Sequence, residues 1–136
     1  MAGRVAALDL GERRTGVALS DPDRLIATPL EVVPSGELTG YLRGLLAEQG
    51  VDEVVVGLPK TMAGGVGFQA RAVLDTLARL RREFPGVRFV EWDERLTTRI
   101  AAAGKRAGKK KGRREPVDHL AAASILQEYL ARRGDL

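Results

Sequence analysis

The sequence has no cysteine, and this absence excludes several kinds of chemistry at once. A chain without thiols forms no disulfide, holds no zinc through thiolates and offers no cysteine nucleophile. Histidine is nearly absent as well, because His119 is the only one in the chain. We expect His119 on the surface of a helix, with a role in proton transfer as the alternative.

Aromatic residues and long apolar runs are also scarce. Aromatics make up 4% of the chain, with a single tryptophan, Trp92, which we expect in the core. No apolar run is long enough to span a membrane, and the amino terminus has no long apolar signal region. These absences predict a cytoplasmic protein with no membrane partner. With 44% hydrophobic residues, the chain predicts one domain, residues 1–136, that buries a core of its own.

The positive charge is concentrated in one segment. The formal net charge of +4 and the isoelectric point near 9.8 indicate an anionic partner only weakly. Residues 105–114, however, contain seven basic side chains and no acid. Such a run is usually a solvated surface segment, yet its place between two of the motifs described below favours a phosphate-binding loop equally. Because the run lacks aromatics that stack on bases, contact with a nucleic-acid backbone is favoured over reading of the bases.

The stretch at residues 5–10 predicts a central strand that carries an acid near its end. It is apolar on both alternating faces except at Asp9, a pattern typical of a strand covered on both sides. An ionised carboxylate is costly to remove from water unless a cation or several donors replace that water. Asp9 is therefore expected to hold a metal, meet a basic partner or cap the following turn, which Gly11 and Gly16 bracket. A plain hairpin, in which Asp9 accepts hydrogen bonds from turn amides, explains this stretch equally well.

Apolar periodicity and turn residues predict three strands followed by alternating helices and strands. Ser35 is the predicted amino-terminal cap of the first helix, and Gly50 is its predicted carboxyl-terminal cap. The predicted strands cover residues 5–10, 16–20, 25–33, 54–56 and 87–92, and the predicted helices cover residues 38–49, 68–84 and 118–133.

This order of elements predicts an α/β fold with a mixed five-stranded sheet flanked by helices. Right-handed crossovers place the fourth strand beside the first and the fifth beyond it, which gives the strand order 3-2-1-4-5. The carboxyl ends of strands one, four and five then share one edge, where such sheets usually bind their ligands. That edge collects Asp9, Gly57, Asp93 and Glu94, and Asp118 joins them if the last helix packs across the sheet.

Short motifs are spread from the first predicted strand to the last predicted helix. They are Asp-Leu-Gly and Arg-Thr-Gly within residues 9–16, Val-Gly-Leu-Pro at 56–59, Asp-Glu-Arg-Leu-Thr-Thr at 93–98, Val-Asp at 117–118, Ala-Ala at 121–122 and Ile-Leu-Gln at 125–127. As an ordered set they resemble the signature motifs of the YqgF/RuvX family. The resemblance implies an RNase H-like fold and a metal-dependent nuclease, described both as a Holliday junction resolvase and as a processor of the small-subunit ribosomal RNA precursor. The chain departs from the pattern at Ala63, where the family usually has an acid, and at Gly57, where many RNase H-like nucleases have one.

The resemblance implies that three acids, Asp9, Glu94 and Asp118, are both the catalytic residues and the metal ligands. All three are oxygen donors, for which Mg²⁺ is the expected cation and Mn²⁺ its substitute. Two such cations about 4 Å apart can stabilise the attacking and leaving oxygens of a phosphodiester. Strand alternation puts Asp93 and Glu94 on opposite faces, so geometry does not select between them and the family pattern selects Glu94. Ordinary roles stay open for Glu94, as the ion-pair partner of a neighbouring arginine, and for Asp118, as a helix cap.

Basic residues in and near the motifs are the candidates for nucleic-acid binding. They are Arg13, Arg14, Lys60, Arg95, Lys105, Arg106, Lys109, Lys110, Lys111, Arg113 and Arg114. Two alternatives to a nuclease stay open: a nucleic-acid-binding protein without catalysis, and a phosphotransferase, although its fold needs two related halves and this chain has one. The predicted helices leave no spare apolar stripe that could form a stable dimer interface. A monomer or weak homodimer acting on RNA is therefore favoured, with branched DNA as the alternative substrate.

Overall fold

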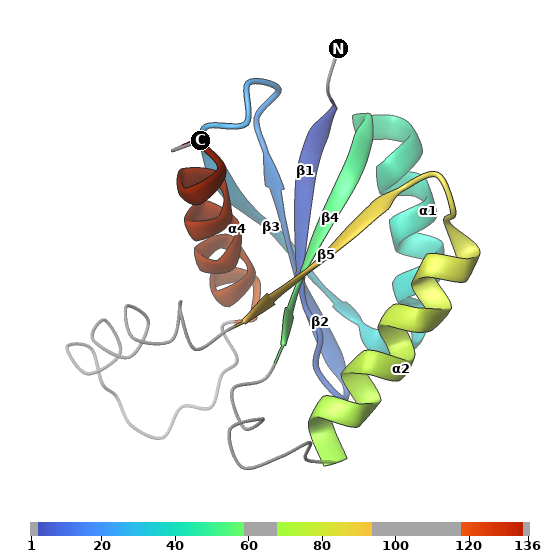
Figure 1. Ribbon diagram of the computed structural model, residues 1–136. Coiled ribbons are helices and arrows are strands. Elements are labelled where there is room, and N and C mark those ends of the chain that lie inside the picture. The colour runs from blue at the N-terminus through green and yellow to red at the C-terminus, as the bar shows by residue number, and fades with distance from the viewer. Residues whose placement is uncertain (1–2, 59–67, 94–117, 135–136) are drawn as a thin grey trace, which may run out of the picture.

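The computed structural model describes residues 3–58, 68–93 and 118–134. Figure 1 shows one sheet between two layers of helix, with α1 and α2 on one face and α4 on the other. The elements are β1 (Arg4–Asp9), β2 (Arg14–Ser20), β3 (Ala27–Pro34), the 3-10 turn η1 (Ser35–Glu37), α1 (Leu38–Gln49), β4 (Val51–Leu58), α2 (Phe68–Glu83), β5 (Arg88–Asp93) and α4 (Asp118–Gly134). None of the helices in these ranges combines the length and apolarity that a membrane crossing needs.

The sheet has the strand order β3-β2-β1-β4-β5, which confirms the predicted topology. β1 pairs antiparallel with β2 and parallel with β4, and β4 pairs parallel with β5. β1 therefore has a hydrogen-bonded neighbour on each side. The parallel strands β1, β4 and β5 all end at the same edge of the sheet, which we call the carboxyl edge.

Each face of the sheet has its own hydrophobic core. Alternate residues of β1 divide between the two cores, as strand geometry requires: Ala6 and Leu8 face α1 and α2, whereas Val5 and Ala7 face α4. All four of these side chains are buried, which explains why the strand is apolar at successive positions. The α1 and α2 side is completed by side chains such as Leu42, Val56, Val73, Leu77, Leu80 and Phe84, and the α4 side by Val55, Ala122, Ile125, Leu126 and Leu130.

β3 is the edge strand beside β2, and its sequence suits that position. Val17 pairs with Glu31 and Ala18 pairs with Pro29, so Leu30 is an extra residue that forms a bulge. Proline lacks an N–H to donate, and bulges discourage pairing between the edges of two sheets. Large apolar side chains are nevertheless exposed near this strand and at the start of α4, where the sequence predicted no spare apolar surface. They are Leu25, Ile26, Leu30 and Leu120.

Of the two caps predicted for α1, the structure has the one at the carboxyl end and lacks the one at the amino end. Gly50 adopts a left-handed conformation, with φ of 64°, and its N–H donates to the carbonyl of Leu46, so this cap is confirmed. The prediction for Ser35 is wrong, because Glu37 holds the cap position and makes no side-chain capping bond. The physical reason is that Ser35 lies in η1, where its hydroxyl is used by the loop that joins β1 to β2.

A polar cluster closes the opposite edge of the sheet. Arg24, whose φ is 59°, donates to the carbonyl of Gly3 and forms ion pairs with Asp52 and Glu53. Nearby, Asp21 organises the turn before β3, because its Oδ1 accepts the N–H groups of Leu25 at 2.7 Å and Ile26 at 2.9 Å. The bond from Ile26 and then that from Leu25 lower the pKa of Asp21 below its ordinary value of 3.8.

These bonds predict that the stability contributed by Asp21 depends on pH. The carboxylate form is favoured more in the folded than in the unfolded protein, so its contribution is complete above pH 3.8 and is lost as the pH falls through the lowered native pKa. Urea unfolding of the parent and Asp21→Ala should therefore show a stability difference near neutral pH that shrinks in acid.

Asp21→Asn is the control for this titration. It keeps an acceptor oxygen in the turn but cannot lose a charge, so its stability difference from Asp21→Ala should not change with pH. A parent whose advantage over Asp21→Ala is equal in neutral and acid solution contradicts the assignment.

Candidate active site

The carboxyl edge of the sheet holds the only predicted catalytic acid whose side chain the structure describes. Asp9 is the last residue of β1, and it lies opposite Gly16 of β2 in the antiparallel ladder. Its burial is intermediate between core and surface. Asp93 is the last residue of β5 and pairs with Leu58 at the end of β4. The backbones of both acids thus reach the same edge.

α4 begins near this edge, at Asp118. Later in the helix, Gln127 contacts the segment just before β3, and Tyr129 contacts Glu53 near the start of β4. Since Asp118 precedes Gln127 by nine residues, about 13 Å of helix separates them, which brings the first turn back toward the strand ends. Figure 1 shows α4 running in this direction across the sheet. α4 therefore packs across the sheet, and the place of Asp118 in the site stays a prediction.

Three polar contacts fix α4 along the sheet. The side chain of Gln127 binds the backbone at the start of β3. Its Oε1 accepts the N–H of Ala27 at 3.0 Å, and its Nε2 donates to the carbonyl of Leu25 at 3.1 Å. The hydroxyl of Tyr129 donates to the buried carboxylate of Glu53. Because these contacts join side chains to fixed strands, they set how far the helix extends toward the carboxyl edge.

Trp92 belongs to the same contact region, which refines its predicted place in the core. It is partly buried against α4, where its ring meets Tyr129 edge to face with a centroid distance of 5.7 Å. The guanidinium of Arg132 lies 5.7 Å from the centre of the same ring. The sequence predicted a buried position for Trp92, but it did not predict its contacts with these two side chains of α4.

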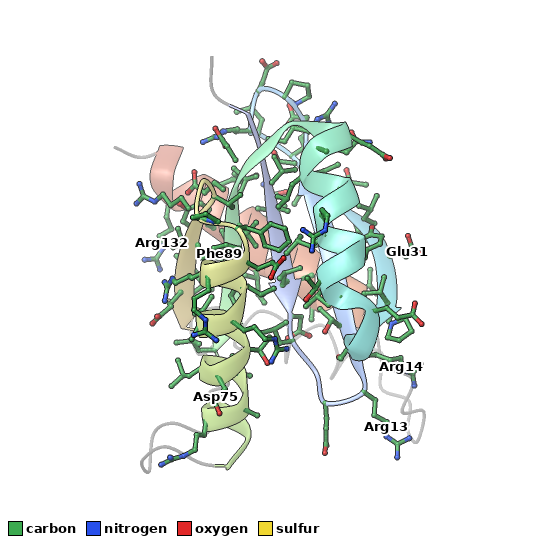
Figure 2. All side chains as sticks on the ribbon, turned by 90° about the vertical axis from the view of Figure 1, so that its right-hand side faces the viewer. Arg13, Arg14, Glu31, Asp75, Phe89 and Arg132 are labelled. Carbon is green, nitrogen blue, oxygen red and sulfur yellow. The ribbon has the colours of Figure 1, made fainter. Side chains whose placement is uncertain are left out.

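Two exposed arginines lie in the hairpin that follows Asp9, Arg13 in the loop and Arg14 at the start of β2. Figure 2 shows the side chains of Arg13 and Arg14 extending away from the body of the protein at the end of this hairpin. Gly11 permits the tight turn, because a Cβ added there would lie 2.3 Å from the carbonyl oxygen of Arg14. Gly16, predicted to bracket the turn, instead lies inside β2. The loop can thus present positive charge next to the acid without a side chain filling the turn.

Ser35 connects this loop to the end of β3. Its N–H donates to the carbonyl of Arg13 at 2.8 Å, and its hydroxyl donates to the carbonyl of Gly11 at 2.7 Å. The hydroxyl of Thr15 lies 3.0 Å from the hydroxyl of Ser35. Sequence reasoning missed this role because a serine shortly before a helix is typical of a cap. The one available signal was Thr15, a polar residue in an otherwise apolar strand.

Several predicted site residues lie outside the described residues. For Asp93, Asp118 and His119 the structure describes the backbone alone. Within the described ranges, no group of three or more histidines or acids is placed to hold a metal. Glu94 lies outside the described residues, so its selection over Asp93 stays a prediction. The other predicted site residues outside the described ranges are Lys60, Arg95, Lys105, Arg106, Lys109, Lys110, Lys111, Arg113 and Arg114, and so is Ala63.

The arrangement of sheet and helices is an RNase H-like fold. Over 97% of this chain and 96% of the other, it is similar to the structure of T. thermophilus RuvC in complex with a Holliday junction substrate, with a TM-score of 0.61 and 18% sequence identity. A second structure, of Thermus thermophilus RuvC, gives a TM-score of 0.55 and 16% identity over 96% of both chains. At these identities the similarity shows a common fold.

Sequence comparison places the chain more narrowly. Residues 3–132 match the model of the RuvX family, described as Holliday junction resolvase, and the chain belongs to that family. A protein of Rubrobacter xylanophilus is 66% identical over 128 residues, covering 94% of this chain and 92% of its own. One from Geobacillus thermodenitrificans is 42% identical over 93% of this chain and 96% of its own. Both carry the name "Putative pre-16S rRNA nuclease". The family and the fold predicted from the sequence are confirmed.

We expect the hydrogen bond between Tyr129 and Glu53 to make a measurable contribution to the stability of the protein. Tyr129→Phe removes the hydroxyl that donates to Glu53. Glu53 is only 6% exposed, so its carboxylate would lose one donor in a buried position. Losing a partner of a buried polar group costs about 1–3 kcal/mol, so the free energy of unfolding should fall by that amount in urea.

Tyr41→Phe is the matched control. Burial, and after it the charge of Glu31 on the exposed edge strand, raises the pKa of Tyr41. Since Glu31 is accessible to water, this second substitution should cost about 1 kcal/mol or less. Equal losses for both tyrosines would show that the Tyr129 contact does not anchor the helix.

Proposed function

We propose that this protein is a metal-dependent endonuclease that hydrolyses phosphodiester bonds in structured nucleic acid, with precursor ribosomal RNA as the favoured substrate. One observation carries the proposal: Asp9 ends the central strand of an RNase H-like sheet, in a chain 66% identical to a relative named as a pre-16S rRNA nuclease. The nuclease prediction from the sequence agrees with that name and with the family's description. The whole chain acts as one domain, and its cytoplasmic location stays a prediction from the sequence.

The catalytic groups in this proposal are Asp9, Glu94 and Asp118. The position of Asp9 supports it, since this carboxylate ends β1 at the carboxyl edge of the sheet and is only partly buried. The chain offers no thiolate, so its acids are an oxygen donor set that suits Mg²⁺ or Mn²⁺. When bound, such a cation supplies Lewis acidity that stabilises charge on the phosphate oxygens. The carboxylates would hold such a cation and orient the attacking water.

The proposed binding surface adds positive charge around these acids. Arg13 and Arg14 support it from described positions, because both are exposed in the hairpin that follows Asp9. Lys60, Arg95 and the basic residues between 105 and 114 extend the surface along the sequence. Charges that contact phosphates fix the substrate without reading its bases, which suits a nuclease that recognises shape.

Holliday junction resolution is the second candidate function. It is favoured by the description of the RuvX family and by the RuvC structure whose fold this chain shares. Symmetric resolution needs two cuts made in coordination, most simply by a two-fold dimer, whereas RNA trimming needs only a monomer. We favour the monomer acting on RNA. Cleavage of both substrates side by side, with sedimentation of the protein, separates the two functions.

The first test of the site is Asp9→Asn, which keeps the shape of the side chain and removes its charge. We expect the variant to fold and to bind nucleic acid as the parent does. Mg²⁺-dependent cleavage should fall by roughly 100-fold or more, the scale of losing a group that stabilises the transition state. Asp23→Asn is the control, because this exposed acid lies in the turn after β2, at the opposite edge of the sheet. A variant at Asp9 that cleaves as fast as the control shows that the proposed site is wrong.

A second test concerns the basic segment. Replacing Lys109, Lys110 and Lys111 with glutamine should weaken binding to unrelated sequences alike. The slope of log affinity against log salt should flatten by about 0.7–0.9 for each phosphate that the variant no longer neutralises. The control removes the same charge from exposed arginines of α2 and β5, at Arg79, Arg82 and Arg88. An equal change of slope in both triple variants would mean that net charge, and not this segment, attracts the nucleic acid.

A further inference from the structure

Ser35 makes a hydrogen bond to each half of the loop between β1 and β2. The ladder between these two strands stops at the pair Asp9 and Gly16. Beyond that pair, β2 stays bonded to β3, as far as the pair Arg14 and Pro34. The half of the loop that follows β1 has no ladder partner of its own. The hydroxyl of Ser35 supplies one, by donating to the carbonyl of Gly11.

The hydrogen-bond pattern gives the serine three simultaneous roles. Its N–H donates to the carbonyl of Arg13, and its single hydroxyl proton goes to Gly11. A hydroxyl donates only one hydrogen, so in the pair with Thr15 the serine oxygen accepts and the threonine donates. Thr15 is fully buried, which makes its donor costly to leave unpaired. Ser35 thus joins both halves of the loop to a hydroxyl fixed in the core.

We propose that Ser35 is a positioning residue for nucleic-acid binding: its hydroxyl holds the Gly11 half of the β1–β2 hairpin against the half that its N–H holds at Arg13, and so fixes the turn from which Arg13 and Arg14 meet the phosphate backbone. This inference rests on the proposed function and adds a residue to it. An arginine on a fixed backbone has only its side chain to order on binding, whereas one on a loose loop must order the backbone too. Gly11 strengthens the constraint, because the loop passes so close to the carbonyl of Arg14 that a Cβ does not fit.

The same geometry separates binding from the chemical step. Asp9 is held by the ladder to β2, and its strand is paired to β4 up to Leu8 and Val56, so neither attachment involves Ser35. Loss of the serine hydroxyl should therefore weaken substrate binding and leave kcat at saturating substrate nearly unchanged. A residue needed only for folding would instead lower the amount of active protein, which reduces apparent kcat and leaves KM unchanged.

The test measures affinity first without cleavage, for a fluorescein-labelled RNA hairpin and a labelled four-way DNA junction in Ca²⁺. Ser35→Ala should raise Kd about 3- to 10-fold, the factor that corresponds to losing one hydrogen bond. Ser35→Thr keeps the hydroxyl and should restore affinity to within about 2-fold of the parent. In Mg²⁺, Ser35→Ala should raise KM by a similar factor while kcat changes by less than about 2-fold.

Two further variants separate positioning from stability. Thr15→Val removes the buried hydroxyl but leaves the bond between Ser35 and Gly11, so it should lower thermal stability with Kd close to that of the parent. Arg13→Ala should weaken binding less in the Ser35→Ala background than in the parent, because the two residues act on one contact.

Each remaining outcome overturns the inference. It fails if Ser35→Ala binds as the parent does, if Thr15→Val weakens binding equally, or if the effects of Ser35→Ala and Arg13→Ala are additive. A parent that binds neither labelled probe overturns both this inference and the proposed function. Normal cleavage by Asp9→Asn, in contrast, removes the proposed site while the binding results for Ser35 stand by themselves.

Discussion

The hydrogen bonding of β1 to a strand on each side is the constraint on which the rest of this structure depends. That pairing satisfies the backbone of a strand whose side chains are buried on both faces, so Val5 to Leu8 can pack against helices in two directions. The strand ends at Asp9, where the buried run stops and a polar group is tolerated. The position of the acid is thus a consequence of how far the core extends along β1.

The position of α4 depends on contacts near the opposite edge of the sheet. Gln127 and Tyr129 fasten this helix to the starts of β3 and β4, and Ala122 lies fully buried against the sheet. A helix held at one end by polar contacts and along its length by packing has little freedom to slide. The first turn, which begins at Asp118, is therefore placed by contacts made two to three turns away.

The sequence predicted the architecture well because local patterns determined most of it. A run that is apolar on both faces identified β1, helical spacing identified the buried stripe of α2 from Val73 to Leu80, and Gly50 identified the end of α1. Contacts between distant residues were not predictable in this way. Ser35 reaches Gly11 across 24 positions, and Glu53 reaches Tyr129 across 76, so no local pattern reports either pair. For the candidate site, motif resemblance supplied Glu94 and Asp118, which periodicity alone did not single out.

Direct observation of the metal tests the central claim, that Asp9 is a ligand at the carboxyl edge of the sheet. A crystal of the protein soaked in Mn²⁺, with anomalous diffraction recorded, locates the cation independently of any activity assay. If Asp9 is a ligand, Mn²⁺ should lie within about 2.3 Å of one of its oxygens and of an oxygen of at least one further carboxylate from β5, α4 or the segment between them. A crystal in which Mn²⁺ binds elsewhere, while the carboxylate of Asp9 is fully engaged by backbone amides of the hairpin, would contradict it.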